Sequence, residues 1–562
     1  MDKLPLVSEF IEALELLQFP DVAFKDWCES MREALNDRKS VDVRKLYADG
    51  LRQLFGGESR DLALSSGGGS VHRHFSDVVK KKVTDAFGIE GSKLVKMDAK
   101  KFGSECQGIL KSYKSLEPTA LKDLSPWLSR FNALDRDNKI EIPGQYTGRS
   151  KPMPEYHVNI FGFEESVLVL KSKQRPCRIT IRGDDEKEHR FLVKTGEDLR
   201  QDDRIERLFG AMNALFTADP SCRAKHLQLV TYGVVPLTTR VGLIEWLDGT
   251  VVLKDFQRRG LDEGSQGNLA RCSRSFGLWS TEDYAKAYKE PSQAVSRFGR
   301  CVQQASRESL SKALLGLSSC PEAFFALRSR FVLSHATLCV AHWVLGVGDR
   351  HLGNFLVSTN TGLEIGIDFG YAFGLAAQFL PIPELMPFRL SPQYLGLLEP
   401  LGKEGPLASA MQDALRALRA GAESILDVLD VFVQEPTVDW MRLAKRQQAG
   451  SSPQASKRQQ GTREVSLDWF PRQKVSIVRQ KLEGGHPSYI LRDELKLRKT
   501  NQPDFASLEL VCLGAPGVES RMRRRFARGD KLSPRDQVDC LLEQATDPAI
   551  LGLTWTGWEP WL

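Results

Sequence analysis

The chain has 562 residues, and its 41% hydrophobic and 27% charged residues are ordinary for a soluble globular protein. The length predicts roughly two to four domains with a large core, and a net charge of +6 is too small for this length to indicate nucleic-acid binding by itself. Ten cysteines without a C-x-x-C pair exclude the common zinc patterns and favour reduced thiols, and we expect neither a signal peptide nor a membrane span.

The first 140 residues are predicted to form a helical region. A glycine- and serine-rich stretch at 65–70 interrupts it. A segment rich in proline and glycine, 143–154, marks a domain boundary. The first hydrophobic residues recur at the spacing of one helix face: Leu6, Phe10, Leu14 and Leu17.

A different pattern begins at Tyr156, where short runs alternate between apolar and polar residues and predict an antiparallel sheet. Two turn-rich segments, KSKQRP at 171–176 and GDDEKE at 183–188, separate some of the runs. A helix is predicted over 202–216, because its apolar residues share one face and two acids at its start favour the helix dipole. The predicted strands are 156–161, 166–170, 178–182, 191–194, 226–235 and 241–247.

Residues 251–500 are predicted to be mostly helical. The longest apolar run, near 338–347, contains His342 and ends in glycines, and it predicts a buried helix that leads into a loop. Two polar segments interrupt the helices, at 263–300 and at 445–461, and the second has the composition of a disordered loop.

A phosphoryl-transfer site needs a cation for the phosphates, oxygen ligands for Mg²⁺ and a carboxylate beside the incoming hydroxyl. Lys194 offers the cation, since it ends a predicted strand and is followed by Glu197 and Asp202 at the next helix. A lysine on a small sheet reaches ATP phosphates when a helix acid fixes its side chain. A surface lysine beside solvated acids is the alternative at this spacing.

The segment GVGDRHLGN, residues 346–354, offers further groups on one loop that its glycines allow to bend sharply. Asp349 suits acceptance of the substrate hydroxyl proton, and His351 would assist it or stabilise the transferring charge. Asn354 suits Mg²⁺, which takes oxygen ligands, and Asp368 in the DFG after an apolar strand is the natural second ligand. Each residue alone could simply bond the backbone of a turn. Together, and with a lysine upstream, they predict an ATP- and Mg²⁺-dependent phosphotransferase.

At this point the motifs resemble a family. The sequence is similar to the phosphatidylinositol 3-kinase-related protein kinases in three segments: DRHLGN, GIDFG and, upstream of both, KTGEDLRQDDRIERLF. In that family the protein-kinase order HRD is reversed to DRH. SKQRP resembles the family's phosphate loop, which is not glycine-rich, and QATDPAILGLTWTGWEPWL resembles its C-terminal FATC element. The resemblance implies an α+β, two-lobed protein-kinase-like fold of the PI3/PI4-kinase type, with ATP between the lobes.

The resemblance also implies a domain organisation. Residues 1–140 correspond to the end of a FAT-like segment and a helical bundle. The expected kinase domains are an N-lobe at 151–250 with its phosphate loop at 169–176, a C-lobe at 251–500 with the catalytic loop at 346–354 and the activation loop at 366–391, and FATC at 530–562.

Roles for single residues follow from the resemblance by position. Lys194 would contact the α- and β-phosphates, oriented by Glu197 or Asp202. Asp349 would be the base and His351 its helper, and Asn354 and Asp368 would hold Mg²⁺, with Mn²⁺ as the alternative. The remaining expected ATP contacts are Ser172 and Gln174 over the phosphates, Tyr232 at the back of the adenine pocket, Glu245, Trp246 and Leu247 at the hinge, and Leu356 and Ile367 as the adenine floor.

Three positions depart from the family pattern. Tyr371 stands where relatives usually have histidine after DFG, Gly353 replaces a more usual polar residue, and Thr195 replaces the glycine after the lysine. None of the three removes a required charge, so we expect an active kinase rather than an inactive scaffold.

Several segments resemble one branch of this family more closely, among them GLIEWL and IGIDFGYAFGLAAQFLPIPELMPFRL. This closer resemblance runs from about 140 to 562 and thins at 260–319. It implies a nuclear serine/threonine protein kinase that phosphorylates Ser/Thr-Gln sites and acts in the DNA damage response and double-strand break repair by non-homologous end joining. The implied partners are protein substrates, the Ku heterodimer and DNA ends, although the helical-repeat arm that holds DNA ends in that branch is absent from this chain.

A phosphoinositide kinase is the alternative enzyme. A loop that receives a polyanionic headgroup should carry several basic residues. Between Asp368 and Leu390 the sole basic residue is Arg389. The loop is instead apolar, which suits a peptide: Phe373, Leu375, Phe379, Leu380 and Ile382.

Two basic clusters, 521–528 (RMRRRFAR) and 80–82, leave nucleic-acid binding open as a third hypothesis. We expect each to be a solvated face, and the first would also suit a nuclear import signal. The tryptophans of the C-terminal segment, Trp555, Trp558 and Trp561, are expected to pack against the C-lobe and thereby support the activation loop.

Overall fold

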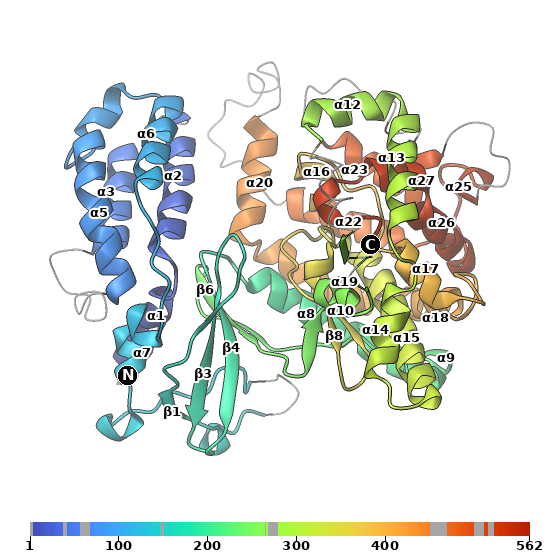
Figure 1. Cartoon of the computed structure of the whole chain (residues 1–562), viewed down its shortest axis with the longest axis horizontal. Coiled ribbons are helices and arrows are strands. Elements are labelled where there is room, and N and C mark those ends of the chain that lie inside the picture. Colours follow the sequence, from blue (N-terminus) through green and yellow to red (C-terminus); the bar gives the residue numbers. More distant parts are fainter. Residues whose placement is uncertain are drawn as a thin grey trace. The chain divides into compact units, whose positions relative to one another are not determined.

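The computed structural model describes residues 4–36, 42–56, 68–146, 148, 151–262, 264, 266–267, 279–449, 469–498, 508, 511–514 and 522–562. The chain divides into two compact units (Figure 1). The first unit comprises Met1–Asp203 and Tyr232–Trp246, and the second comprises Arg204–Thr231 and Leu247–Leu562. The helical region and the N-lobe sheet thus share one unit, and the boundaries predicted for the domains stay predictions.

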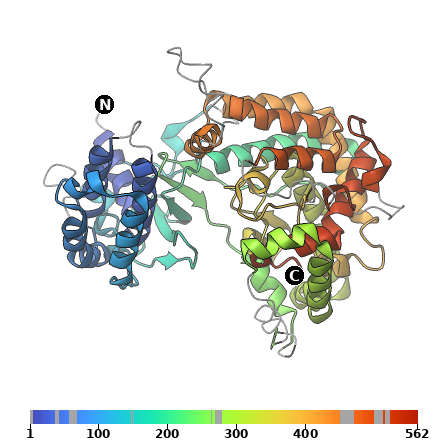
Figure 2. The same ribbon diagram turned by 90° about the horizontal axis from the view of Figure 1, so that it is seen from above.

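The helical region of the first unit is a bundle in which α2, α3, α5 and α6 lie side by side (Figures 1 and 2). Aromatic side chains fill its core, among them Phe24, Phe75 and Phe102. Asp42 and Asp98 cap the starts of α3 and α6 through their carboxylates. The helices are α1 Leu4–Glu15, α2 Pro20–Asn36, α3 Val43–Phe55, α5 Ser70–Phe87, α6 Ala99–Lys111 and α7 Pro126–Arg130.

The sheet of the first unit is antiparallel, as predicted, with the strand order β1-β3-β4-β6-β5 and β2 paired with β3. Helix α1 packs against this sheet, because Leu14 and Leu17 share a core with Ile179 and Leu243. The strands are β1 Ile160–Phe163, β2 Leu168–Val169, β3 Cys177–Gly183, β4 Glu188–Thr195, β5 Val234–Pro236 and β6 Val241–Glu245.

The strand predicted over 226–235 is wrong for most of its length, since β5 begins at Val234. The backbone of this segment bonds to side chains instead of a neighbouring strand. The Asn213 amide donates to the Leu229 carbonyl and accepts from its N–H, each at 2.8 Å. The Thr337 hydroxyl donates to the Gln228 carbonyl. Periodicity could not reveal these partners, because they lie far away in sequence.

The second unit is mostly helical, as predicted, and contains a small antiparallel sheet with the order β7-β8-β9. The strands are β7 Thr250–Val252, β8 Phe355–Ser358 and β9 Glu364–Gly366. The helices are α8 Arg200–Ala218, which begins in the first unit, α9 Pro220–Ala224, α10 Leu253–Arg259, α12 Thr281–Lys289, α13 Pro291–Gln304, α14 Ser309–Leu317, α15 Pro321–Leu345, α16 Leu375–Phe379, α17 Pro392–Leu398, α18 Pro406–Ala420, α19 Ala422–Gln434, α20 Val438–Ala449, α22 Trp469–Leu482, α23 Pro487–Lys496, α25 Met522–Arg525, α26 Pro534–Thr546 and α27 Pro548–Leu553.

The two polar segments predicted as interruptions are described only in part. In the first, the interruption predicted over 281–300 is wrong, because α12 and most of α13 occupy these residues. Residues 263, 265 and 268–278 of this segment lie outside the described residues. In the second, α20 continues to Ala449, and 450–461 lie outside them.

Helix α15 carries the chain to the predicted catalytic loop. Within the described residues it is the one helix long and apolar enough to cross a membrane by length and composition. However, 56% of its most apolar window is buried inside the protein. All residues from Ser334 to Leu345 are buried, including His342, as expected for the core helix of a globular unit.

Candidate active site

Lys194 lies near the end of β4, opposite Gly242 of β6. Its ammonium nitrogen is 3.3 Å from Glu197 Oε2, and the side chain is largely buried. Of the two acids that the sequence offered, Glu197 therefore forms a defined ion pair with the lysine. Asp202 is buried in the first turn of α8.

The predicted phosphate loop, residues 169–176, begins at the end of β2 and forms a tight turn over 171–176 before β3. The Leu170 N–H donates to the Pro176 carbonyl at 3.0 Å and closes the loop. The Ser172 hydroxyl accepts the N–H of Arg175, whose φ is +51°. Ser172 is exposed and Gln174 is half-buried. The hydroxyl of Ser172 thus lies on an exposed part of a closed loop.

The hinge segment follows β6. The Glu245 N–H donates to the Gly233 carbonyl, and the Glu245 carboxylate accepts the Gly233 N–H, both at 2.8 Å. The Trp246 N–H donates to the Arg190 carbonyl, and the Arg178 guanidinium lies 5.2 Å from the Trp246 ring centre. Two of the three hinge N–H groups are therefore already bonded within the first unit.

The remaining residues predicted to line the adenine pocket lie in both units. Tyr232 is buried in the first unit. In the second unit, Leu356 lies on β8 and Ile367 directly follows β9. Both are half-buried, and the Ile367 N–H donates to the carbonyl of Asn354 at 3.1 Å. Ile367 is thereby fixed to the catalytic loop.

Two glycines allow the catalytic loop to approach the activation segment. Gly346 ends α15 with a φ of +60°, and a Cβ there would lie 2.6 Å from the Gly374 nitrogen. A Cβ on Gly348 would lie 2.3 Å from the Ala376 Cβ. The Gly348 N–H donates to the Tyr371 carbonyl at 2.7 Å. Any side chain at either glycine would push these segments apart.

Arg350 ties the catalytic loop to the DFG segment, a role that sequence reasoning missed. Its guanidinium is buried and donates to the carbonyls of Gly348, Ile367 and Asp368. It also lies 5.7 Å from the ring centre of Phe355. Arg350 stands between Asp349 and His351 in the sequence, which gives no signal of its burial, and such a buried charge needs several partners.

Asp349 has the surroundings of a general base. Its φ is +57°, and its N–H donates to Glu384 Oε2 at 2.5 Å. Burial raises the pKa of Asp349 to about 6, and the charge of Asp368 adds to this rise while Arg350 opposes it. The carboxylate is therefore ionised at neutral pH yet more basic than an exposed aspartate.

His351 is held as a neutral imidazole. Its Nδ1 accepts the Gly353 N–H at 3.0 Å, which assigns the ring proton to Nε2. Burial lowers the pKa of His351, and the positive charge of Arg350 lowers it further. The ring can therefore donate a hydrogen bond from Nε2 to a developing negative charge.

Asn354 and Asp368 fit a hard divalent cation. The Asn354 side chain is buried, and its amide nitrogen donates to the Asp349 carbonyl at 2.9 Å, which leaves its amide oxygen as the ligand atom. The Asp368 carboxylate is exposed, on a backbone with a φ of +62°. Within the described ranges no group of three or more His, Cys, Asp or Glu forms a metal site. Two oxygen ligands, completed by phosphate and water, are what Mg²⁺ commonly takes.

The DFG phenylalanine anchors Asp368 to the core. Phe369 is buried, with its ring 5.4 Å from that of Phe209 on α8 and 6.4 Å from that of His342 on α15. Tyr371, which replaces the usual histidine, is 38% exposed. Its carbonyl supports Gly348, so this substitution leaves the loop contact intact.

The C-terminal segment packs against the activation loop, as predicted. Arg389 is 1% exposed and donates to the carbonyls of Trp558, Glu559 and Leu562. Its Nε donates to the carbonyl of Arg350 at 3.1 Å, which links the segment to the catalytic loop. Trp558 and Trp561 are buried, whereas Trp555 is 46% exposed.

Two expectations about exposed surfaces are wrong. The apolar loop that was predicted to suit a peptide does not offer Phe373 or Leu375 to it, because both are buried, and the Phe373 ring packs against Phe432 and Trp440. Phe379, Leu380 and Ile382 are half-buried. The arginine cluster is not a uniformly solvated face, because Arg523 is buried and bonds to Glu543 and Asp547. Lys80–Lys82 are exposed, as expected.

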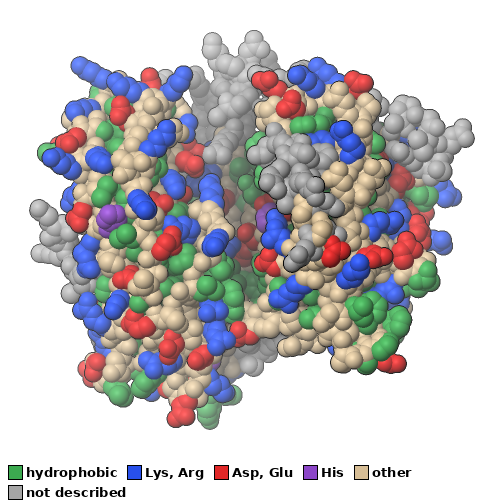
Figure 3. All heavy atoms as spheres, viewed as in Figure 1, with side chains coloured by type: hydrophobic (Ala, Val, Ile, Leu, Met, Phe, Trp, Pro, Cys, Tyr) green, Lys and Arg blue, Asp and Glu red, His purple; other side chains and the backbone are tan. Residues whose placement is uncertain are grey.

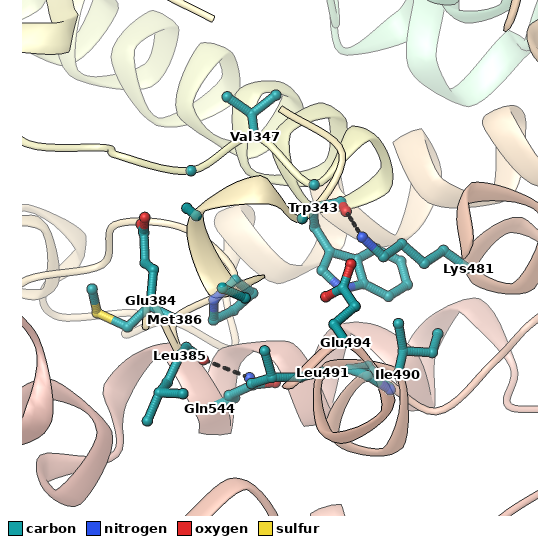
Figure 4. Close-up of a pocket in the computed structure, with 17 residues that line it drawn as sticks. Trp343, Val347, Glu384, Leu385, Met386, Lys481, Ile490, Leu491, Glu494 and Gln544 are labelled. Carbon is teal, nitrogen blue, oxygen red and sulfur yellow. Dashed lines mark hydrogen bonds between the residues drawn. The ribbon is translucent and has the colours of Figure 1, made fainter. Parts of the chain in front are cut away.

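A cavity of about 60 Å³ lies beside the catalytic loop (Figure 4). Gly348 and Glu384 line it, together with side chains from α23 and α26. The Gln544 amide nitrogen donates to the Leu385 carbonyl at 2.8 Å, and the Lys481 ammonium donates to the Trp343 carbonyl at 2.8 Å. Among the described residues no hydrogen-bond partner is recorded for Gln544 Oε1 or Glu494 Oε1.

Comparisons with known proteins agree with this geometry. Residues 188–442 match the family described as phosphatidylinositol 3- and 4-kinase, and residues 531–562 match the FATC domain. The chain is 41% identical to the DNA-dependent protein kinase catalytic subunit of Gallus gallus and 40% identical to that of Xenopus laevis, in each case over 100% of this chain and 14% of the relative. It is 29% identical to the serine/threonine-protein kinase mTor of Drosophila melanogaster, over 77% of this chain and 17% of the relative. The chain thus spans about a seventh of the length of the curated relatives that it matches most fully.

Proposed function

Because this chain belongs to the phosphatidylinositol 3-kinase-related protein kinases, we propose that it transfers the γ-phosphate of ATP to serine or threonine residues of proteins. The observation that carries this proposal is the second unit's catalytic loop, in which Arg350 holds Asp349, Asn354 and Asp368 on one connected backbone. A buried base and two oxygen ligands are the parts that phosphoryl transfer requires.

The first unit would bind the phosphates of the nucleotide. Lys194, held by Glu197, would contact the α- and β-phosphates, and Ser172 and Gln174 would lie over them. At the hinge, the N–H groups of Glu245 and Trp246 already have acceptors, so we assign the adenine contact to the Leu247 N–H, for which no acceptor is recorded among the described residues.

The second unit would supply the chemistry. Asp349 would accept the proton of the substrate hydroxyl, since its raised pKa makes it a stronger base than an exposed aspartate and leaves it ionised at neutral pH. The Nε2–H of His351 would stabilise the transferring phosphoryl group. Asn354 and Asp368 would hold Mg²⁺ or Mn²⁺, which neutralises charge on the phosphates.

A protein substrate fits the structure better than a lipid. Arg389 is the sole basic residue between Asp368 and Leu390, and its guanidinium is buried against the C-terminal segment. It is therefore unavailable to a phosphoinositide headgroup. The retained Lys194, Asp349, Asn354 and Asp368 also argue against an inactive scaffold.

We propose that the residue after the target serine or threonine is glutamine. Gly348, next to the proposed base, lines the cavity beside the catalytic loop. The cavity offers the buried acceptors Gln544 Oε1 and Glu494 Oε1, whose residues are labelled in Figure 4. A primary amide has two N–H donors for such acceptors, whereas an ionised glutamate carboxylate has none and would meet the like charge of Glu494. A Ser-Glu peptide should therefore be a poor substrate.

We further propose a role in double-strand break repair by non-homologous end joining in the nucleus, with the Ku heterodimer and DNA ends as partners. The support is the identity to DNA-dependent protein kinase catalytic subunits along the whole chain. Direct DNA binding by basic clusters gains no support, because Arg523 is buried and because Lys/Arg and Asp/Glu side chains are interspersed on the face that Figure 3 shows.

The test is transfer of radiolabelled phosphate from ATP to a Ser-Gln peptide, a Ser-Glu peptide and phosphoinositide vesicles. We expect transfer to the Ser-Gln peptide alone, and its loss in Asp368→Ala. Asp430→Ala, which removes an exposed carboxylate on α19, is the matched control and should retain activity. Transfer to lipid but not to peptide would overturn the proposal, and equal transfer by Asp368→Ala would show that a contaminating kinase is responsible.

A further inference from the structure

The phosphate loop is attached to the helical region of the first unit through Arg175. The Arg175 guanidinium donates to the Ser115 hydroxyl at 3.0 Å and to Glu117 Oε1 at 2.8 Å. Its central carbon lies 3.6 Å from the centre of the Phe19 ring, and Nη1 is 3.8 Å from Asp21 Oδ1. We call Phe19, Asp21, Ser115 and Glu117 the Arg175 anchor.

The Arg175 anchor is partly removed from water. The side chain of Arg175 is 18% exposed and that of Asp21 is 13% exposed, and Phe19 is fully buried. A guanidinium over an aromatic ring and beside a desolvated carboxylate is held more firmly than a surface ion pair. The side chain of Glu117 is 76% exposed. Its hydrogen bond therefore orients the guanidinium but contributes little to stability.

The loop conformation itself depends on this attachment. Arg175 has a φ of +51°, a left-handed conformation that is unfavourable for a residue with a Cβ. Its own N–H donates to Ser172, so the position of the exposed serine follows from the backbone of Arg175. The anchor therefore stabilises the strained turn that presents Ser172.

The turn between α1 and α2, together with α2 itself, makes further contacts with the phosphate loop and with the residues around Lys194. Asp26 on α2 accepts hydrogen bonds from Gln174 of the phosphate loop and from Gln18 of the turn. Gly196, two residues after Lys194, packs so closely that a Cβ there would lie 2.8 Å from Gln18 Nε2. The Cys177 thiol, directly after the loop, donates to the Leu17 carbonyl at 3.7 Å. The α1–α2 turn and α2 thus contact both the phosphate loop and the segment that follows Lys194.

We propose that the helical region is a positioning element for ATP. Arg175 is the positioning residue through which this region fixes the position of the phosphate loop relative to the sheet. The inference rests on the proposed kinase function. Arg175 does not touch the phosphates, because its guanidinium is committed to the Arg175 anchor. A displacement of the α1–α2 turn would therefore change ATP affinity and leave the transfer step at Asp349 unchanged.

The test separates ATP affinity from chemistry with Arg175→Met in the full chain. We expect the KM for ATP to rise about tenfold while kcat and the KM for peptide stay nearly unchanged, because the variant loses positioning rather than a reacting group. Arg175→Lys should give a KM for ATP between those of wild type and Arg175→Met, since an ammonium cannot replace the planar guanidinium. The matched control is Arg182→Met, which removes an exposed arginine of β3 that pairs with Glu164, and it should behave as wild type.

A second variant keeps the proposal testable if Arg175→Met does not fold. Ser115→Ala with Glu117→Ala removes two acceptors of the guanidinium from the helical side without altering the loop. We expect it to raise the KM for ATP in the same direction, and to add little when combined with Arg175→Met, because both changes break one interaction. An unchanged KM for ATP in these variants, or a fall in kcat alone, would overturn the proposal.

ATP binding is also measured directly, as the increase in Tm that saturating ATP produces. This increase should be smaller in Arg175→Met than in Arg182→Met. If wild type is stabilised by ATP but transfers no phosphate, the proposed function fails while the positioning role of Arg175 is still decided by the Tm shifts. Equal shifts in both variants would contradict that role.

Discussion

At the scale of single residues, the candidate site combines backbone strain with burial. Asp349 and Asp368 both have positive φ angles, which only a few non-glycine residues adopt. Arg350 compensates by bonding to the backbone on each side, at Gly348 and at Asp368. One buried guanidinium therefore fixes the backbone that carries the two carboxylates, through the carbonyls of Gly348 and Asp368. A strained but fixed geometry of this kind is typical of functional sites.

The pKa of Asp349 gives a prediction at this scale. Burial raises that pKa from 3.8 to about 6, so the base becomes protonated as the pH falls through about 6. We expect kcat/KM for peptide to fall about tenfold per pH unit below that point. Asp349→Asn should lower kcat by about 10²–10⁴-fold and remove this dependence, whereas Asp430→Asn should keep it. A profile that stays flat down to pH 5 would contradict Asp349 as the base.

At the scale of elements, the activation segment is fixed from two sides. Its N-terminal part bonds to the end of α15, where the Phe373 N–H donates to the Leu345 carbonyl at 2.8 Å. Its C-terminal part is fixed by Arg389, which bonds to the carbonyls at the end of the chain. The Gln393 amide of α17 also donates to the Trp561 carbonyl at 2.9 Å. The C-terminal residues therefore form part of the support of the catalytic loop.

Two tryptophans of this segment allow a matched comparison. Trp558 is buried with its ring 4.1 Å from the Arg389 guanidinium, whereas Trp555 is 46% exposed. We expect Trp558→Ala to lower the free energy of unfolding by about 3–5 kcal/mol and to reduce kcat strongly, because Arg389 loses its packing. Trp555→Ala should change either quantity little. Chemical denaturation and peptide assays of both variants measure this, and equal effects would show that the segment acts only through general stability.

At the scale of the whole molecule, buried cations in the second unit link stability to pH. Lys474 on α22 is fully buried and donates to the Gln378 side chain of α16. Burial lowers its pKa from 10.5 to about 7, with Lys481 acting in the same direction and Glu494 opposing. The folded protein therefore binds this proton more weakly than the unfolded chain does.

This difference in proton affinity makes the free energy of unfolding depend on pH. Between about pH 7 and pH 10.5 unfolding takes up a proton at Lys474, so this residue makes the free energy of unfolding rise with pH, by up to about 1.4 kcal/mol per pH unit. We expect Lys474→Met to flatten this rise, whereas Arg442→Met, which removes an exposed cation of α20, should leave it unchanged. Urea unfolding at several pH values measures the slope, and an identical slope in Lys474→Met would rule out this assignment.

Sequence patterns were sufficient to predict the parts of this protein that depend on local neighbours. Periodicity predicted the antiparallel strands, the helix after Lys194 and the buried α15. Glycine turns and motif spacing predicted the site residues Lys194, Asp349, Asn354 and Asp368. Such patterns are informative because they involve neighbours within a few residues.

The burial of polar groups and the identity of their hydrogen-bond partners emerged from the packing of the folded chain. The loop of Phe373 was predicted to suit a peptide because it is apolar, but Phe373 lies in the core. Arg523 was predicted to be solvated and is buried against two acids. Arg350, Arg389 and Arg175 gave no sign in sequence of their partners, which for Arg389 and Arg175 lie up to 173 residues away. Local pattern cannot specify such contacts, because they arise when distant segments pack and a buried cation must satisfy its hydrogen bonds with whatever carbonyls and carboxylates surround it.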